Sequence, residues 1–359
     1  MKLTIINNIQ TPYRKKLFDK IKERSFSRGV DFRVYYLSDT ESVRDWGAVE
    51  LGSYEAIFDV LFQVRNKLTT TSDIIFNYGY FSKVICSDVT IFFGYSYTTY
   101  IVGASLRKLF GKKNVLFCES TKSDSRTKGL IFRIKRFIIR SIFDTFLVPG
   151  VESRKYLVDL GVEAREINIA VNSSELRPRL DMETSKDNEI VSLLYVGRLS
   201  REKRIVETII ALKECSLDFT MKVVGSGELN NEVLALVKGD DRFELLGALN
   251  QDSLSSVYSS SDILILPSKL EPWGLVVNEA INFGLAVLVS SNVGCRHELV
   301  KDNGLTFESD NFSDMIDKLA FIIEDLSNMQ KKSTKLSQLV TGDIQADSFI
   351  QPFLKGTYE

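Results

Sequence analysis

One segment of the sequence combines a strand end, a tight turn and the start of a helix. The apolar run at 262–266 is followed by PSKLEPWGLVVNEAINFG, in which Pro267 stops the strand and Gly274 permits a turn. The stretch LVVNEAINF then has apolar residues at helical spacing. The free N–H groups of Gly274, Leu275 and Val276 would therefore form a helix N-terminus at the carboxyl edge of a sheet, where an anion is favoured.

Two carboxylates flank this turn. Glu271 and Glu279 are eight positions apart, so one can reach a ligand at the mouth of the turn while the other reaches along the helix. Carboxylates are natural acceptors for the vicinal hydroxyls of a sugar or a ribose. A second interpretation needs no ligand: Glu271 caps the helix and Glu279 is solvated. The spacing alone leaves both interpretations open.

A cluster of positive charge follows another expected strand. In LLYVGRLSREKRI the strand ends at Gly197, and Arg198 and Lys203 lie in the turn and the first helical residues. Both cations can point into the same crevice as the helix terminus, where a diphosphate would receive charge-assisted hydrogen bonds. The other interpretation is a pair of exposed basic residues beside a loop. The glycines of VVGSGELN lack the third glycine of a dinucleotide fingerprint, so a nicotinamide cofactor is not indicated.

These segments belong to two runs of alternating strands and helices. In the first run, apolar segments predict strands at 2–7, 32–37, 73–76, 89–93, 113–118, 144–148 and 166–171, with helices over segments such as 13–28 and 97–110. In the second run, strands are predicted at 190–197, 220–224, 243–246, 262–266 and 285–289. Helices are predicted between and after them, near 202–214, 228–238, 252–260, 275–283 and 312–328.

The predicted fold class is α/β, with two doubly wound Rossmann-like domains facing a central cleft. The first domain covers residues 1–171 and the second covers 190–344. Residues 172–189 lack a periodic apolar face and are interpreted as a linker. Residues 345–359 are expected to form a last helix that crosses back to the first domain.

Composition excludes several classes of site. With 359 residues, 44% of them hydrophobic and 26% charged, the chain is typical of a globular protein with two domains. The four cysteines have no metal-ligand spacing and the single histidine rules out a multi-histidine metal site, so no metal is expected. The apolar run at the start ends at Ile9, too short for a signal peptide or a spanning helix. The chain is therefore expected in the cytoplasm.

Charge is distributed unevenly along the chain. Residues 1–175 hold 27 Lys and Arg against 19 Asp and Glu, and the remainder holds 19 against 28. A basic half attracts nucleic acid, an anionic bilayer or a phosphorylated acceptor; nucleic acid is disfavoured because no recognition motif is present. Segment 128–143 sets Arg133, Arg136 and Arg140 on one helical face amid large apolar residues. Such a helix either lies in a bilayer interface or packs on a sheet with a basic outer stripe.

Taken in order, the motifs resemble the retaining glycosyltransferases of family 4, which have the GT-B fold. The second half carries the resemblance in GRLSREK (197–203), VVGSGE (223–228), LGAL (246–249), SDILILPSKLEPWGLVVNEAINFG (261–284) and SNVGCRHELVKDNGLTF (291–307). The first half is similar to the branch that builds bacterial surface polysaccharides such as lipopolysaccharide or capsule. That similarity lies in NNIQTPYRKKLFDKI (7–21), FFGYS (92–96), CEST (118–121) and FLVPGVESRKYLVDLGV (146–162).

The resemblance implies a donor site in the second domain. Arg198 and Lys203 would bind the diphosphate of the donor, Glu271 the hydroxyls of the transferred sugar, and Glu279 the ribose. The backbone from Gly274 through Leu275 to Val276 would bind the phosphates. The base would lie near Gly247, Ala248 and Leu249. The remaining implied donor-binding residues are Gly197 and Gly225.

The resemblance also implies an acceptor site in the first domain. Its candidate residues are Thr11, Tyr13, Tyr95 and Glu119. Glu119 stands where many members have a histidine and is taken as a catalytic candidate together with Arg198, Lys203 and Glu271. Tyr95 either stacks on a sugar or packs in the core. A further departure is Arg204, which stands where the family usually has a glycine after the lysine.

The implied function is transfer of a hexose with retention, from a UDP- or GDP-sugar to a saccharide or lipid-linked oligosaccharide. No metal or other cofactor is expected, because Arg198, Lys203 and the helix terminus would supply the positive field. An anionic membrane surface is a further expected partner, with the protein peripheral on the inner membrane. The alternative is a noncatalytic protein of the same fold that binds a nucleotide sugar or a polysaccharide, and turnover would distinguish the two.

Overall fold

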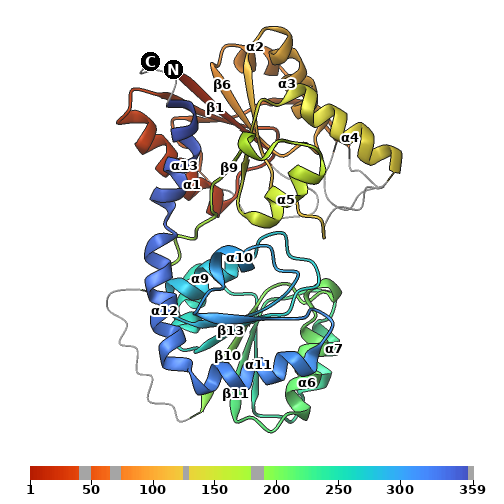
Figure 1. Ribbon diagram of the computed structural model, residues 1–359, viewed down its shortest axis with the longest axis vertical. Coiled ribbons are helices and arrows are strands. Elements are labelled where there is room, and N and C mark those ends of the chain that lie inside the picture. The colour runs from red at the N-terminus through yellow and green to blue at the C-terminus, as the bar shows by residue number, and fades with distance from the viewer. Residues whose placement is uncertain (40–49, 65–73, 124–128, 179–189, 355–359) are drawn as a thin grey trace. The chain divides into compact units, whose positions relative to one another are not determined.

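The computed structural model (Figure 1) describes all residues except 40–49, 65–73, 124–128, 179–189 and 355–359. The chain divides into two compact units, each with its own parallel sheet. The first unit comprises Met1–Pro149, Ser153–Val171 and Gly342–Glu359, and the second comprises Gly150–Glu152 and Asn172–Thr341. Much of the segment interpreted as a linker lies outside the described residues.

The first unit is built on a seven-stranded parallel sheet in the order β3-β2-β1-β6-β7-β8-β9. Its strands are β1 (Lys2–Asn7), β2 (Asp31–Tyr36), β3 (Glu55–Ile57), β6 (Val89–Phe93), β7 (Lys113–Phe117), β8 (Thr145–Val148) and β9 (Ile167–Ile169). Its first helices are α1 (Pro12–Phe26), α2 (Tyr80–Ile85), α3 (Thr98–Leu109), α4 (Gly129–Ile142) and α5 (Val151–Asp159). Among the described helices, none is long and apolar enough to cross a membrane.

One predicted strand of the first unit lies elsewhere than expected. The run predicted at 73–76 forms β5 (Ile74–Tyr78), which pairs antiparallel with β4 (Asp59–Val64) in a separate two-stranded sheet. The position beside β2 is filled instead by β3, whose three residues are too few to stand out as a strand in the sequence. The edge of the main sheet is thus set by a pairing between distant segments.

The second unit is built on a six-stranded parallel sheet in the order β12-β11-β10-β13-β14-β15. Its strands are β10 (Val191–Val196), β11 (Phe219–Val224), β12 (Phe243–Gly247), β13 (Ile263–Leu266), β14 (Ala286–Ser290) and β15 (Gly304–Phe307). Its helices are α6 (Ile205–Glu214), α7 (Asn230–Val237), α8 (Gln251–Ser259), α9 (Leu275–Asn282), α10 (Arg296–Leu299), α11 (Phe312–Glu324) and α12 (Leu326–Leu339).

Three details of the second unit differ from the sequence prediction. The helix predicted at 202–214 is preceded by a short 3₁₀ turn, Arg201–Lys203, and α6 begins at Ile205. The helix predicted at 312–328 is divided at Asp325, whose φ of -111° and ψ of 23° interrupt the helix between α11 and α12. Strand β15 lies where no strand was predicted. The order of strands reverses between β10 and β13, and ligands bind α/β sheets at the carboxyl ends beside such a reversal.

The final helix, α13 (Gly342–Leu354), belongs to the first unit and packs against α1. Lys20 and Arg24 of α1 pair with Asp343 at 2.9 and 3.0 Å. On the inner side of α13, the ring of Phe349 stacks on that of Phe93, with ring centres 5.7 Å apart. The helix therefore contributes part of the core of the first unit, next to the sheet.

A fully buried arginine connects α3 to the loops around the first sheet. Arg107 donates to the Asn114 side chain at 2.9 Å and to the carbonyls of Ser87, Lys113 and Asp88 at 3.0, 2.8 and 3.3 Å. Burial lowers the pKa of this guanidinium to about 10. In the folded state the Arg107 guanidinium is thus held by hydrogen bonds to neutral oxygen atoms. Those oxygens lose their donor if the side chain is removed.

We expect Arg107→Leu to lower the free energy of unfolding by about 3–5 kcal/mol, because several buried carbonyls are left without a donor. Chemical denaturation followed by circular dichroism measures the change. The matched control is Arg33→Leu, at an exposed position of β2, which should change stability by about 0.5 kcal/mol or less. Equal losses in the two variants would contradict a structural role for the buried cation.

Candidate functional site

The carboxyl edge of the second sheet gathers the residues that the sequence singled out. Arg198 and Lys203 follow β10, Gly225 follows β11, Ala248 and Leu249 follow β12, and Glu271 and Gly274 follow β13. All of these strands are parallel, so their carboxyl ends lie at one edge. The predicted donor-binding loops are therefore neighbours.

Gly274 sets the start of α9. Its φ of 102° is one that residues with a Cβ rarely adopt, and an added Cβ would lie 3.1 Å from the side chain of Leu266. The helix begins at the next residue, Leu275, as the sequence predicted, and the N–H of Val277 donates to the Gly274 carbonyl at 2.9 Å. The first amides of α9, including those of Leu275 and Val276, thus lie at the carboxyl edge of the sheet.

A second loop supports this turn from β14. The N–H of Gly294 donates to the carbonyl of Glu271 at 2.9 Å, and the N–H of Cys295 donates to that of Trp273 at 3.0 Å. A Cβ on Gly294 would lie 1.8 Å from the Pro272 carbonyl oxygen, so only glycine fits there. The sequence analysis did not single out Gly294, although it lies in the motif VGCRHELV. It positions the backbone that carries Glu271.

Glu271 and Lys203 form an ion pair between the loops after neighbouring strands. Their side chains are 16% and 13% exposed, so the pair is sheltered from water but reachable. The N–H of Lys269 donates to the carbonyl of Glu202 at 2.8 Å, which joins the same two loops through their backbones. Glu271 is therefore engaged by a cation, rather than serving as a helix cap.

Arg198 lies nearer to solvent than Lys203. Its side chain is 70% exposed and lies 3.3 Å from Glu202 in an i,i+4 ion pair, a kind of contact that holds weakly in water. Its carbonyl accepts a hydrogen bond of 2.8 Å from the hydroxyl of Tyr195, which fixes the backbone beside Gly197. The guanidinium is thus available to move toward a ligand while its backbone is held.

The glycines after β10 and β11 allow two loops to touch. Gly225 has a φ of 134°, and a Cβ at this position would lie 1.8 Å from the carbonyl oxygen of Gly197. The N–H of Gly225 donates to the carbonyl of Gly247 at 2.8 Å, which extends the contact to the loop that begins with Ala248. These glycines therefore bring three loops together along the edge of the sheet.

Glu279 is half-buried on α9 and not simply solvated. It accepts a hydrogen bond of 2.7 Å from the hydroxyl of Tyr258 on α8, whose ring stacks on Phe283 with centres 5.2 Å apart. Burial of the ring is the main cause that raises the pKa of Tyr258 well above its ordinary value, and the nearby Glu279 carboxylate raises it further. The tyrosine remains a protonated donor that orients the carboxylate.

Arg204 has a backbone conformation typical of glycine. Its φ of 58° makes it the one non-glycine residue with a positive φ in the part of the chain that the structure describes. The side chain is held by an ion pair with Asp310 at 2.6 Å, and its guanidinium lies 5.0 Å from the ring centre of Phe312. These contacts hold the turn that presents Lys203, and the conformation gives a physical reason why a glycine would suit this position.

The carboxyl edge of the first sheet holds a second cluster. Glu119 follows β7 and accepts a hydrogen bond of 2.6 Å from Arg14, whose guanidinium lies 4.7 Å from the ring centre of Phe93. Arg14 also lies over the ring of Tyr13. The hydroxyl of Thr11, at the start of α1, is buried with no hydrogen-bond partner among the described residues. A polar pair and a buried hydroxyl therefore occupy this edge.

Residues 178–338 match the family model described as glycosyl transferases group 1. Curated relatives include the sulfoquinovosyl transferase SQD2 of Arabidopsis thaliana, 27% identical over 212 residues, which are 54% of this chain and 40% of that protein. Another is an uncharacterized 41.2 kDa protein in the cps region of Klebsiella pneumoniae, 26% identical over 235 residues, or 61% of this chain and 64% of that one. These alignments thus span between 40% and 64% of the relatives' own length.

Solved glycosyltransferase structures match over almost the whole chain. Alr3699/HepE from Anabaena, in complex with UDP, superposes with a TM-score of 0.73 at 15% identity and covers 99% of both chains. The lipopolysaccharide outer core galactosyltransferase WaaB, in its apo form, gives 0.72 at 14% identity over 99% of this chain and 100% of that one. The fold is therefore GT-B, as the sequence predicted.

The match to the glycosyl transferases group 1 model covers the loops predicted to bind the donor and lies outside the first unit. In the first unit, the sequence analysis missed Arg14. Arg14 lies in NNIQTPYRKK beside Thr11 and Tyr13, and its position in this motif is the signal that points to it. The ring of Tyr95 is packed against the core, with its hydroxyl donating to Ser120 at 2.9 Å and the Lys135 ammonium 4.3 Å from its ring centre. These contacts favour the packing interpretation of Tyr95.

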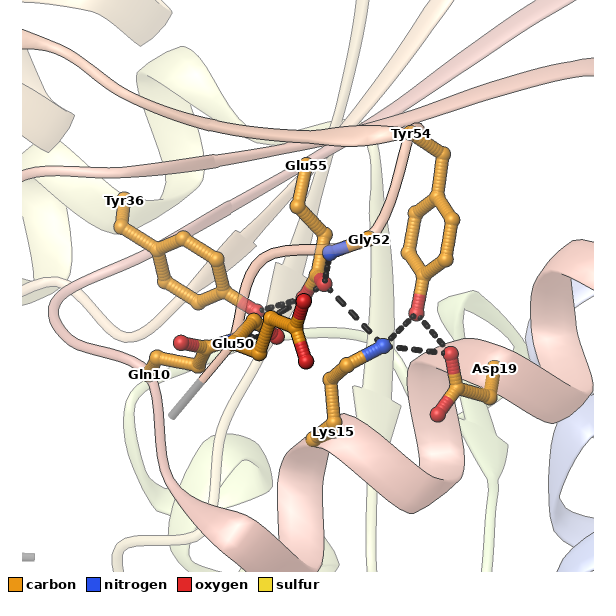
Figure 2. Close-up of polar contacts among 8 residues, drawn as sticks. All are labelled: Gln10, Lys15, Asp19, Tyr36, Glu50, Gly52, Tyr54 and Glu55. Carbon is orange, nitrogen blue, oxygen red and sulfur yellow. Dashed lines mark hydrogen bonds and ion pairs between the residues drawn. The ribbon is translucent and has the colours of Figure 1, made fainter. Parts of the chain in front are cut away.

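A buried carboxylate holds the start of α1 against the edge of the first sheet. Figure 2 shows Glu55 at the centre of this cluster, where it accepts hydrogen bonds from Tyr36 and, at 2.7 Å, from the Gly52 amide. Lys15 of α1 lies 3.2 Å from the same carboxylate, and Gln10 donates to it at 3.4 Å. The cluster is structural, and it fixes the loop that leads into the polar edge at Arg14.

Proposed function

We propose that this chain is a retaining hexosyltransferase that uses a nucleoside diphosphate sugar as donor. The observation that carries the proposal is the sheltered Lys203–Glu271 pair at the carboxyl edge of the second sheet, beside the N-terminus of α9. The family match over the donor loops supports it, and so do the complexes of Alr3699/HepE with UDP and with UDP-glucose. The donor is expected to carry UDP or GDP.

The donor's diphosphate would lie against the first amides of α9, with Lys203 and Arg198 as charge partners. Breaking the bond between the sugar and the diphosphate places negative charge on the leaving oxygen, and preorganised positive groups stabilise that charge most strongly in the transition state. Lys203 would then share its ammonium between Glu271 and the phosphate. No metal or other cofactor enters this proposal, because these groups supply the positive field.

Glu271 and Glu279 would recognise different parts of the donor. Glu271 sits at the mouth of the turn, where the transferred sugar would lie, and its carboxylate accepts hydrogen bonds from sugar hydroxyls. Glu279 lies farther along α9, where it accepts a hydrogen bond from Tyr258, and its carboxylate would bind the ribose. The base would be placed by the loop around Ala248 and Leu249.

The acceptor would be a saccharide or a lipid-linked oligosaccharide of bacterial surface polysaccharide synthesis. The Klebsiella relative from a cps region and the likeness to WaaB support this class. The polar edge of the first unit, formed by Thr11, Arg14 and Glu119, would bind the acceptor's hydroxyls. A lipid-linked acceptor is presented at a membrane, so we also propose that the protein works in the cytoplasm as a peripheral protein of the inner membrane.

A panel of UDP-, GDP- and ADP-sugars tests the donor. A correct donor at 100 times its dissociation constant should stabilise the protein by about 2.7 kcal/mol, which a thermal melt resolves. Incubation with the stabilising donor and extracted lipid-linked oligosaccharides should release nucleoside diphosphate, with the same yield in EDTA, and the product should keep the donor's anomeric configuration. Stabilisation without release would indicate the noncatalytic binding protein, and no stabilisation by any donor would contradict the proposal.

A further inference from the structure

Helix α4 lies on the outside of the first unit (Figure 1). Several of its large apolar side chains are exposed to solvent. Leu130, Ile134 and Phe137, which we call the apolar stripe, are 69%, 50% and 73% exposed. They recur at i, i+4 and i+7, so they lie on one face of the helix. A soluble surface rarely leaves three such neighbours in water without a partner.

The helix is firmly attached by its other side. Ile139 and Ile142 are buried in the core cluster of the first unit, and Phe132 and Ile138 pack against it. Lys135 donates to the hydroxyl of Tyr156. Helix α4 is therefore held in the fold by its buried face. The apolar stripe on its exposed face is not needed to hold the helix in place.

A row of arginines runs alongside the apolar stripe. Arg133, Arg136 and Arg140, which we call the basic stripe, are exposed on the neighbouring face of α4. Together with Phe137 and Ser141 they line a surface hollow of about 520 Å³. The sequence has no acidic residue between Asp124 and Asp144, so the helix carries no internal charge compensation. Guanidinium groups in such a row can donate charge-assisted hydrogen bonds to the oxygens of several phosphates.

We propose that α4 docks on an anionic phospholipid bilayer, lying in the plane of the interface. The apolar stripe would enter the boundary between headgroups and acyl chains, while the basic stripe would bind lipid phosphates. A second copy of the chain fits this face poorly, because two basic stripes would repel each other. The proposal rests on the peripheral membrane location proposed above and deepens it by naming the surface that docks. Docking needs neither donor nor acceptor, so it can fail while sugar transfer holds.

Vesicle sedimentation without donor or acceptor tests the proposal. The protein should sediment with vesicles of phosphatidylcholine and phosphatidylglycerol at 50 mM salt, remain largely free at 500 mM salt, and bind pure phosphatidylcholine weakly. Replacing the basic stripe by R133A, R136A and R140A together should weaken binding to the anionic vesicles by roughly 100-fold, about fivefold for each arginine. Replacing the apolar stripe by L130S, I134S and F137S together should weaken it at least tenfold.

Matched controls separate docking from folding. Leu234→Ser alters an exposed leucine of α7 and Arg201→Ala alters an exposed arginine of the second unit, and neither should change sedimentation. Retention of donor-induced thermal stabilisation in both stripe variants shows that they fold and that the donor site is separate. Equal binding to neutral and anionic vesicles, no binding at low salt, or full binding by either stripe variant would overturn the proposal. A dimer that F137S converts to a monomer would assign the face to self-association and overturn it as well.

Discussion

Replacing Lys203 with alanine should lower the turnover number by about 10²–10³-fold while the fold remains intact. The change removes a preorganised cation from the position where the leaving diphosphate would develop charge. Steady-state release of nucleoside diphosphate measures the effect. Arg198→Ala should lower turnover on the order of 10²-fold for the same reason, because its exposed guanidinium is placed to close on the diphosphate.

Two further variants distinguish the loss of the Lys203 ammonium from the effect of leaving the Glu271 carboxylate unpaired. Arg201→Ala removes an exposed arginine from the same turn and should retain turnover within about twofold. The double variant Lys203→Ala with Glu271→Gln removes the carboxylate that Lys203→Ala leaves unpaired. We expect no recovery in the double variant. Full activity in Lys203→Ala, or recovery in the double variant, would refute the role of the ammonium in transfer.

The second large effect concerns the two glutamates, which we expect to act on different parts of one donor. Glu279→Gln should raise the Kd of the free nucleoside diphosphate by about 10–100-fold, because a charged acceptor of the ribose hydroxyls is lost. Glu271→Gln should leave that Kd nearly unchanged and weaken only the binding of the sugar-bearing donor. Isothermal calorimetry with both ligands measures each change.

Glu214→Gln, at the exposed last residue of α6, is the control for the charge change. It should leave the Kd of both ligands unchanged, since the end of α6 leads into the amino end of β11, opposite to the carboxyl edge that forms the candidate site. If Glu271→Gln and Glu279→Gln weaken the free nucleotide equally, the assignment of one carboxylate to the sugar and the other to the ribose is wrong.

The cluster at the carboxyl edge of the second sheet was predictable because its signals are local. The turn at Gly274, the start of α9 and the cations after β10 each depend on residues within one short segment, and parallel strands then bring the segments to one edge. What the sequence left open was settled by packing: Glu279 meets Tyr258 from another helix, and Glu271 meets Lys203 from another loop. The residues close to each glutamate in the sequence do not indicate which side chain from a distant segment will contact it.

The first unit was harder to predict for the same physical reason. Arg14 and Glu119 are separated by 105 positions, and they meet only because the start of α1 and the end of β7 come together in the fold. The three residues of β3 take the edge beside β2 because Glu55 is held there by groups from α1 and β2, a long-range arrangement without a periodic signature. Segment 74–78 was apolar enough for that position but pairs elsewhere.

The return of α13 to the first unit has a consequence for the order in which the protein matures. Phe349 fills the space against Phe93 and Phe117, so part of this face of the first sheet stays uncovered until residues 342–354 have left the ribosome. The second unit, whose segments from 172 to 341 are all made earlier, can bury its core first. The half of the molecule that is synthesised first is therefore the last to finish folding, and it must stay soluble on the ribosome while its partner helix is still being made.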